Sequence, residues 1–460
     1  MIEESMNGFD SLIVFFPGRS CYMFLSDIHI ENFKGIQKAD FKFTKSMNLI
    51  VGNNGTGKTS ILEAVAVALG GFLAGIQGVN TIHFSKDEIR CENQLLGTGS
   101  VNIAYKTPIK VDANIIIDGK NYHFTRQKKS VSSSRSTIEP RDICKKAESM
   151  ALDNRSILPL ISYQSFSRIS NQKKDKWEDP FSNDFSRVVG YTDCLEEASN
   201  TKMLTNWCKR MDHISWQQDK KIVEYEVVKH AAAQFMQVMM DNDNIQIFYD
   251  KRTEELMYAC DSERLPIRLL SSGFRTLLGM VLDIAYRMAI LNPDLLDHIV
   301  SNTPGIVLID EIDMHLHPNW QWRVVKALQT AFPEIQFIAT THSPIIMASC
   351  KGENMIILNP VDQFLDMPSE VSQGNTVKGW QINDVLEQCM NSCYRDPETV
   401  AMLKQLTLLA KKKLSHTISE EELEIYHSLI KELSAILPQD DVGVEEAALL
   451  SIDEMLGGVL

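Results

Sequence analysis

The segment Gly52–Thr59, which reads GNNGTGKT, has the residue types and spacing of a phosphate-binding loop. Its glycines let successive backbone N–H groups converge on a polyphosphate. Lys58 supplies a positive charge for the outer phosphates, and the Thr59 hydroxyl is a ligand for magnesium. The helix that opens at Ser60 turns its positive N-terminus toward the same anion. The predicted phosphate contacts are Gly52, Asn53, Asn54, Gly55, Thr56, Gly57, Lys58, Thr59 and Ser60.

Two acidic residues, Asp310 and Glu311, end a short apolar segment that reads GIVLIDEID. Asp310 can hold magnesium through water, and Glu311 can polarise a water molecule for attack on the terminal phosphate. A strand that happens to end in acids would explain one of these residues, but not the pair together with the loop. His342, in TTHSP, follows the next strand and suits a hydrogen bond to the terminal phosphate. A lone histidine is more often structural, but its position after a parallel strand favours function.

A second helix start offers another place for an anion. Ser271, Ser272 and Gly273 open the segment SSGFRTLLGMVLDIAYRM, so hydroxyls and free backbone N–H groups point at whatever approaches. The phosphate loop and the magnesium residues already account for the crevice of the sheet. We therefore expect this second start to serve another nucleotide.

Strands and helices that position these residues follow from the apolar patterning. The hairpin at 108–127 turns at Asp118-Gly119, a strong hairpin signal. The segments 305–310 and 335–342 are short apolar runs of the kind buried in a parallel sheet. Further strands are predicted at 24–36, 39–43, 47–51 and 158–164, with helices at 60–76 and 318–332 and a helical pattern from Leu195 to Met240.

At 460 residues the chain is too long for one ordinary core, so we expect one α/β domain with helical additions. The predicted fold is a parallel core sheet plus an antiparallel layer. Met23 directly precedes the first strand pattern, so residues 1–22 are expected to be an extension of little structural consequence. The remaining parts are a first half of the main domain at 23–194, an inserted helical lobe at 195–265, a second half at 266–379 and a helical tail at 380–460.

The composition argues against several classes of protein. No apolar run approaches the roughly 18 residues that a membrane span needs, so no membrane partner is expected. The nine cysteines lack disulfide spacing and suit free thiols in a cytoplasm. Cys389 and Cys393 lie one helical turn apart without a second ligand pair, so metal binding there is not expected. The net charge of −14 opposes general attraction to DNA. A basic stretch at 126–136 remains, and a solvated flexible loop is its favoured interpretation.

The order of these motifs resembles that of ABC-type ATPase heads, in the soluble branch that includes RecF-like and structural-maintenance-of-chromosomes heads. The phosphate loop is followed by Gln164 after a strand, then the LSSG signature, LIDEID and TTHS. The resemblance covers the chain from Phe24 to about Ser349. It implies an ABC-ATPase head fold, with two heads sandwiching two ATP molecules and their Mg²⁺. In that arrangement Ser272 and Gly273 of one copy close on the phosphate loop of the other.

The segments IDEIDMHLHPNWQWRVV and GWQINDVLEQCMNSCYRDPE narrow the branch. They are similar to the ATPase subunits of Septu-type and retron-associated anti-phage systems. That resemblance implies a cytoplasmic homo-oligomer, a dimer or a multiple of dimers, that assembles with an HNH-type nuclease. Nucleotide occupancy would govern the nuclease, and any contact with DNA would come through the complex.

The same resemblance implies roles for single residues. Gln164 would sense the magnesium ion and the attacking water, and Asp313 would lie at the dimer contact. Asp310 and Glu311 would be the magnesium and water carboxylates, and His342 the switch. The signature departs from many relatives, with Ser272 in place of Gly and with Phe274 and Arg275 in place of Gln. These departures predict slow hydrolysis rather than weak ATP binding.

Three other functions have less support in the sequence. A DNA-repair clamp of RecF type would grip DNA through Lys128, Lys129 and Arg135. A transporter ATPase would need a membrane-coupling surface that the tail does not resemble. A self-contained nuclease has little support, because the Asp-x-Asp at 241–243 lies before the signature. The tail either caps the head or docks the partner. The oligomer number, the phage trigger and whether ATP restrains or activates the effector stay open.

Overall fold

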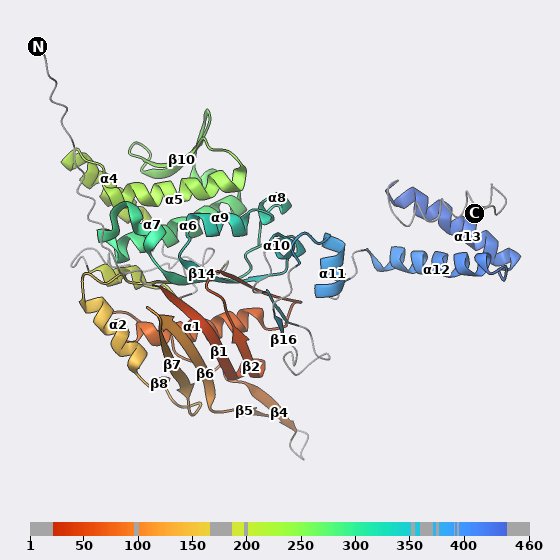
Figure 1. Ribbon diagram of the computed structural model, residues 1–460, viewed down its shortest axis with the longest axis horizontal. Helices are drawn as coiled ribbons and strands as arrows, with labels where there is room; N and C mark the ends of the chain where they lie inside the picture. The colour runs from red at the N-terminus through yellow and green to blue at the C-terminus, as the bar shows by residue number, and fades with distance from the viewer. Residues whose placement is uncertain are drawn as a thin grey trace, which may run out of the picture. The chain divides into compact units, whose positions relative to one another are not determined.

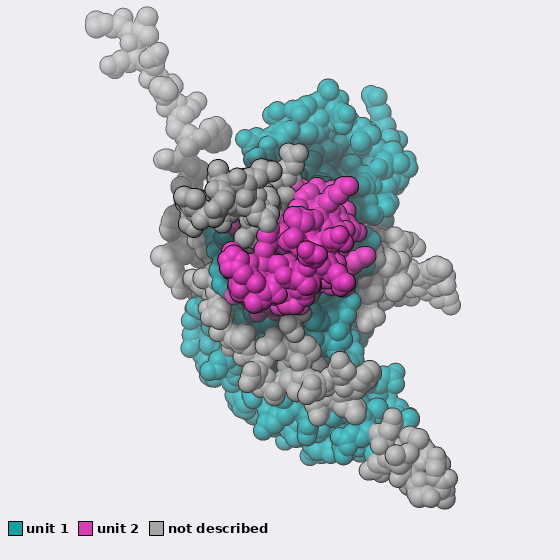
Figure 2. All heavy atoms as spheres, turned by 90° about the vertical axis from the view of Figure 1, so that its right-hand side faces the viewer, with its two compact units in different colours: residues 1–380 teal, residues 381–460 magenta. Residues whose placement is uncertain are grey.

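The computed structural model describes most of the chain in two compact units. The described residues are 22–95, 101–165, 186–196, 201–350, 355–358, 371–373, 377–390, 392 and 395–438. Unit 1 comprises Met1–Trp380 and unit 2 comprises Gln381–Leu460, coloured teal and magenta in Figure 2. The expected N-terminal extension lies outside the described residues except for Tyr22. Within the described part of the chain, no helix has the length and apolar character to cross a membrane.

A six-stranded sheet forms the centre of unit 1. Its strands run in the order β16-β15-β3-β14-β13-β9, and all neighbours are parallel except β16. The bounds are β3 (Met47–Gly52), β9 (Leu160–Gln164), β13 (Gly305–Ile309), β14 (Ile335–Thr341), β15 (Met355–Leu358) and β16 (Val371–Gln373). Every residue of β9, β13 and β14 is buried, as expected for strands covered on both faces. The predicted parallel core sheet is confirmed.

An antiparallel sheet forms a second layer. It has the order β2-β1-β6-β7-β8, with β1 (Met23–Phe33), β2 (Ile36–Lys42), β6 (Ile109–Ile117), β7 (Lys120–Lys128) and β8 (Thr137–Glu139). Asp118 and Gly119 both have positive φ and make the predicted hairpin turn between β6 and β7. Helix α1 (Lys58–Leu73) packs against both β14 and β6 (Figure 1). The helix that begins at the phosphate loop is therefore held between the two sheets.

The inserted region is only partly helical. Helices α4 (Thr201–Gln218) and α5 (Val223–Met240) match the predicted pattern, and α5 packs on α6 (Ser272–Leu291) and α9 (Val324–Ala331) (Figure 1). The rest of the expected helical lobe is an antiparallel sheet of β10 (Ile245–Asp250), β11 (Glu255–Cys260) and β12 (Glu263–Pro266). Alternating burial along β10 shows why these short segments form strands.

The predicted helix at 318–332 is broken. Helix α8 (Pro318–Gln321) ends before α9 begins, and Arg323 between them has φ −112°. The Arg323 guanidinium donates to Met239 O and Asp241 Oδ2, which ties the break to the end of α5. The other elements are β4 (Cys91–Leu95), β5 (Val101–Tyr105), α2 (Asp142–Leu152), η1 (Arg187–Tyr191), η2 (Ile267–Leu269), η3 (Pro293–His298), α7 (Ile299–Asn302) and α10 (Pro344–Ser349).

The basic stretch at 126–136 is not a solvated loop throughout. Arg126 is fully buried, and its guanidinium donates to Val67 O, Ile82 O and Ser136 Oγ. Lys128 is buried as well and donates to Phe84 O. Both side chains hold β7 against neighbouring segments because the strand turns them inward. Of the three cations assigned to a DNA contact, Lys128 is therefore committed to the core.

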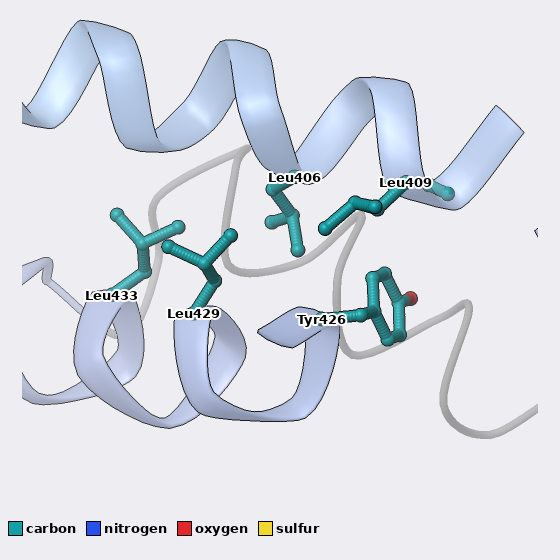
Figure 3. Close-up of a cluster of buried hydrophobic side chains, with 6 residues drawn as sticks. Leu406, Leu409, Tyr426, Leu429 and Leu433 are labelled. Carbon is teal, nitrogen blue, oxygen red and sulfur yellow. The ribbon is translucent and has the colours of Figure 1, made fainter. Parts of the chain in front are cut away.

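Unit 2 consists of α11 (Ile382–Met390), α12 (Pro397–Leu414) and α13 (Glu420–Ile436). Leu406 and Leu409 of α12 face Tyr426, Leu429 and Leu433 of α13 (Figure 3). Asp396 caps α12, and Ser419 and Glu422 form a capping box at the start of α13. These helices lie within the helical tail predicted at 380–460, of which residues 439–460 are outside the described part of the chain.

Candidate functional site

The strand register brings four predicted motifs to one edge of the parallel sheet. Ile309 lies opposite Gln164 on β9 and Ala339 on β14, while Thr341 lies opposite Val51 on β3. Because the carboxyl ends of parallel strands share an edge, the phosphate loop, the acidic pair, Gln164 and His342 follow neighbouring strand ends. This edge is the candidate nucleotide site.

The phosphate loop connects β3 to α1 in a tight turn. Gly55 and Gly57 have φ of +81° and +87°, a conformation that L side chains rarely adopt. The Lys58 ammonium is buried and donates to Gly52 O and Asn53 O, each at 2.9 Å. Burial lowers the pKa of Lys58, and the nearby carboxylates of Asp310 and Glu311 oppose that shift. The loop thus holds a cation beside backbone N–H groups at a helix start, which suits a polyphosphate.

Thr59 and Asp310 meet across the site. The Thr59 hydroxyl donates to Asp310 Oδ2 at 3.0 Å, although the two residues are far apart in the sequence. Hydroxyl and carboxylate oxygens are hard donors that suit Mg²⁺, which is usually bound by one or two protein groups plus phosphate oxygens and water. Among the described residues, no cluster of three or more His, Cys, Asp or Glu side chains could hold a metal alone. The residues present therefore fit a magnesium ion that arrives with a nucleotide.

Glu311 has an unusual backbone. Its φ is +53°, and its N–H donates to Thr340 Oγ1 at 2.7 Å. The same Thr340 hydroxyl donates to Asp310 Oδ1 at 2.6 Å. A left-handed non-glycine residue costs conformational energy and is found often at functional sites. One threonine thus orients both acidic residues, and the Glu311 side chain is left exposed at the end of β13.

The Asp313 carboxylate holds the backbone on which His342 stands. Asp313 Oδ1 accepts from Thr341 Oγ1 at 2.6 Å and from the His342 N–H at 3.2 Å. Burial and the Lys58 ammonium hold the pKa of His342 below its ordinary value of 6.5, against the carboxylates led by Asp313. A neutral imidazole at this strand end can accept or donate one hydrogen bond toward a phosphate. The role of Asp313 at a dimer contact stays a prediction.

Gln164 lies at the same edge, but its side chain makes contacts that the sequence did not indicate. The amide donates to Ser162 Oγ and to Asp283 Oδ2, each at 2.8 Å. Asp283 is on α6 and also accepts from Arg287 Nε at 2.9 Å. The backbone carbonyl of Gln164 accepts from the Asp310 N–H at 2.8 Å. Gln164 therefore connects the acidic pair to the helix that carries the signature, and its contact with magnesium stays a prediction.

The signature begins α6 as predicted. Ser271 is the N-cap residue, and both Ser271 and Ser272 are exposed. The Ser271 hydroxyl makes no capping hydrogen bond. Gly273 is buried against the segment after the acidic pair, where an added Cβ would lie 2.3 Å from His315 O. The first turn of α6 thus presents two hydroxyls outward while its other side packs tightly.

Three positioning residues escaped the sequence interpretation. Thr340 and Thr341 sit in an apolar strand and look like ordinary β-branched residues, and Asp283 lies inside a helix. The sequence offers one signal for these contacts. Two adjacent threonines stand directly before His342, where polar residues end an otherwise apolar strand. Their partners, Asp310 and Asp313, are close only because β13 and β14 are neighbours.

Two family models match the chain. One is described as an AAA domain and matches residues 27–238, and the other, an AAA ATPase domain, matches residues 167–347. The matched ranges contain the phosphate loop, the signature and the acidic pair that the structure brings to α6 and the sheet edge. The chain is an ATPase whose sequence matches models of AAA ATPase domains.

Curated relatives match nearly the whole of this ATPase. The Retron Vc95 probable ATPase of Vibrio cholerae serotype O1 biovar El Tor is 26% identical over 457 residues, covering 88% of this chain and 86% of that protein. The Septu protein PtuA of Bacillus thuringiensis is 22% identical over 415 residues, covering 88% of this chain and 93% of that protein. The predicted resemblance to retron and Septu ATPases is confirmed.

Among solved structures, the ATPase is similar to an SmcHead bound to the C-winged helix domain of ScpA. The identity is 18% and the TM-score 0.46, with 76% of this chain and 97% of that chain covered. A likeness of this size does not bear on what the ATPase binds.

Proposed function

We propose that this ATPase is the nucleotide-binding subunit of a bacterial anti-phage defence complex. In it, two copies would bind ATP and Mg²⁺ between the phosphate loop of one copy and the signature of the other. The observation that carries the proposal is the exposed start of α6. Ser271 and Ser272 face outward, while the phosphate loop, Asp310 and His342 gather at the sheet edge of the same copy.

Each group at the sheet edge has a place in ATP hydrolysis. Lys58 would neutralise the outer phosphates, and Thr59 with Asp310 would hold the magnesium ion. Glu311 would polarise the attacking water, and His342 would bond the terminal phosphate. The signature hydroxyls and N–H groups would complete the cage in trans. The departures at Phe274 and Arg275 support slow hydrolysis, so that bound ATP acts as a resident regulator.

The defence role is proposed from the relatives, since retron and Septu ATPases match this chain along most of their length. We place an HNH-type nuclease as the partner, with ATP occupancy controlling it. The seven cysteines in the described part of the chain are all free, which suits a reducing cytoplasm.

Light scattering tests the shared site. We expect purified wild-type protein with ATP and Mg²⁺ to be a dimer or a multiple of dimers, and Glu311→Gln to hold that state longest because it hydrolyses ATP slowly. Lys58→Met should abolish the ATP-dependent part of the association. A monomer of unchanged mass for the wild type and Glu311→Gln in saturating ATP would contradict the proposal.

The nuclease partner predicts that the ATPase leaves DNA intact by itself. Plasmid incubated with purified protein, Mg²⁺ and ATP should remain supercoiled. Cleavage that needs metal but survives Glu311→Gln would show a nuclease site in this chain and would contradict the proposal.

A further inference from the structure

Arg275 lies in the first turn of α6, on the same outward side as the signature serines. Its side chain is exposed, and its Nη1 donates to Arg268 O at 3.1 Å. Within the described residues, no ion pair neutralises it. The neighbouring Arg268 differs, because its Nε lies 2.7 Å from Glu255 Oε1. Arg275 is thus a cation whose charge is uncommitted within its own copy.

The position of Arg275 is electrostatically unfavourable for the helix. A helix N-terminus carries partial positive charge, so acidic side chains stabilise the first turn and cations destabilise it. The first turn of α6 holds no acidic residue. The cation and the free N–H groups therefore add their positive potentials on one surface, beside the hydroxyls of Ser271 and Ser272, which can donate hydrogen bonds.

Phe274 fixes the direction in which this surface points. Its ring is 7% exposed and lies 5.0 Å from Tyr258 of β11 and 5.6 Å from Trp320 of α8, measured between ring centroids. Gly273 closes on His315 O on the same inward side. Two of the departures from the usual signature are thus explained by the packing: Phe274 anchors the turn, and Arg275, the next residue, projects outward.

We propose that Arg275 is a phosphate-binding residue that contacts the terminal phosphate of the ATP held by a second copy. The inference rests on the proposed shared site and adds to it a residue that distinguishes ATP from ADP. A guanidinium offers a planar fork of N–H donors that matches phosphate oxygens, and arginines supplied by a second subunit serve this purpose in other nucleotide hydrolases. Tethering through Arg268 O would keep the fork near the serine hydroxyls.

The first experiment measures ATP-dependent association in the Glu311→Gln background by light scattering. Arg275→Gln should weaken association about tenfold or more, because a charge-assisted contact to phosphate is lost. Arg275→Lys should restore part of it. Arg268→Gln is the matched control and should change association less than about twofold, since it removes an exposed, paired charge. Binding of a fluorescent ATP analogue to monomer at low protein concentration should stay the same in all variants.

Mixing variants tests whether Arg275 acts in trans. Arg275→Glu and Lys58→Met chains should each fail to associate alone. Their mixture should form heterodimers, because one of the two sites combines an intact phosphate loop with an intact signature. If the mixture fails although both variants bind wild-type chains, Arg275 acts within its own copy and the inference is wrong.

The outcomes separate this inference from the proposed function. Unchanged association of Arg275→Gln, with Glu311→Gln associating normally, would overturn the role of Arg275 alone. A parent Glu311→Gln protein that never associates with ATP would overturn both, because no second copy would then meet the nucleotide.

Discussion

At the scale of single residues, the catalytic groups depend on threonine hydroxyls to which the sequence motifs assign no role. Thr340 Oγ1 donates to Asp310 and accepts from the Glu311 N–H, so it sets the positions of both acidic residues. The Thr341 hydroxyl likewise donates to the Asp313 carboxylate and positions it. The sequence supplies the acids, the lysine and the histidine, but these supporting contacts arise from pairing between strands and could not be predicted from one segment.

Thr340→Val tests this support. Valine keeps the shape of threonine but removes both hydrogen bonds, so we expect the rate of ATP hydrolysis to fall by roughly 10–100-fold. ATP binding should change little, because Lys58 and the loop are untouched. Thr340→Ser keeps the hydroxyl and should retain most of the activity. A Thr340→Val enzyme with the wild-type rate would show that the hydroxyl is dispensable.

The pKa of His342 provides a second test at this scale. Burial and Lys58 lower the folded pKa below 6.5, so His342 should titrate by NMR at a lower pH than an exposed histidine in the nucleotide-free protein. The unfolded chain then binds this proton more readily, so the contribution of His342 to stability is present above pH 6.5 and lost as the pH falls through that value toward the folded pKa.

Lys58→Met removes a positive charge and should raise the pKa of His342 toward its ordinary value. A titration midpoint above 6.5 in the wild type would contradict the burial and charge argument.

At the scale of elements, the signature turn depends on close packing at Gly273. Gly273→Ala would place a Cβ 2.3 Å from the backbone oxygen of His315, which cannot move as a side chain does. We expect the first turn of α6 to shift, which should lower the free energy of unfolding by about 1–3 kcal/mol. The shift should also weaken ATP-dependent association of two copies. ATP binding to the monomer should persist.

Gly279→Ala is the matched control on the same helix. An added Cβ there meets nothing within 4 Å, and alanine favours the helix over glycine by up to about 1 kcal/mol. This variant should be at least as stable as the wild type and should associate normally. Equal behaviour of the two variants would contradict the packing argument.

The elements also show what periodicity can and cannot predict. The buried parallel strands and the Asp118-Gly119 hairpin were predicted, because each is set by local residue types. The sheet at 245–266 was missed, since its strands are four to six residues long and follow a strong helical pattern. The helix at 318–332 breaks at Arg323, whose guanidinium bonds to the distant end of α5.

At the scale of the whole molecule, the parallel sheet explains why residues from Gly52 to His342 form one site. The same topology leaves the start of α6 facing outward with its serines exposed. Composition alone could not predict how two copies meet, because that depends on surfaces rather than on a core. The expectation that two copies share ATP came from the order of the motifs and its resemblance to ATPase heads. Unit 2 forms its own small core between α12 and α13. That core explains why the two helices pack together, but it does not identify a protein that unit 2 would bind.

The most direct test of the shared site is an ATP-dependent cross-link between two copies. Chains with Ser272→Cys and one tag are mixed with chains carrying Asn54→Cys and another tag, then treated with a short bismaleimide. The account predicts a cross-linked heterodimer that requires ATP and Mg²⁺ and exceeds the background from native cysteines in either variant mixed with wild type. Equal cross-linking with and without ATP, or no heterodimer above that background in saturating ATP, would contradict the claim that ATP lies between two copies.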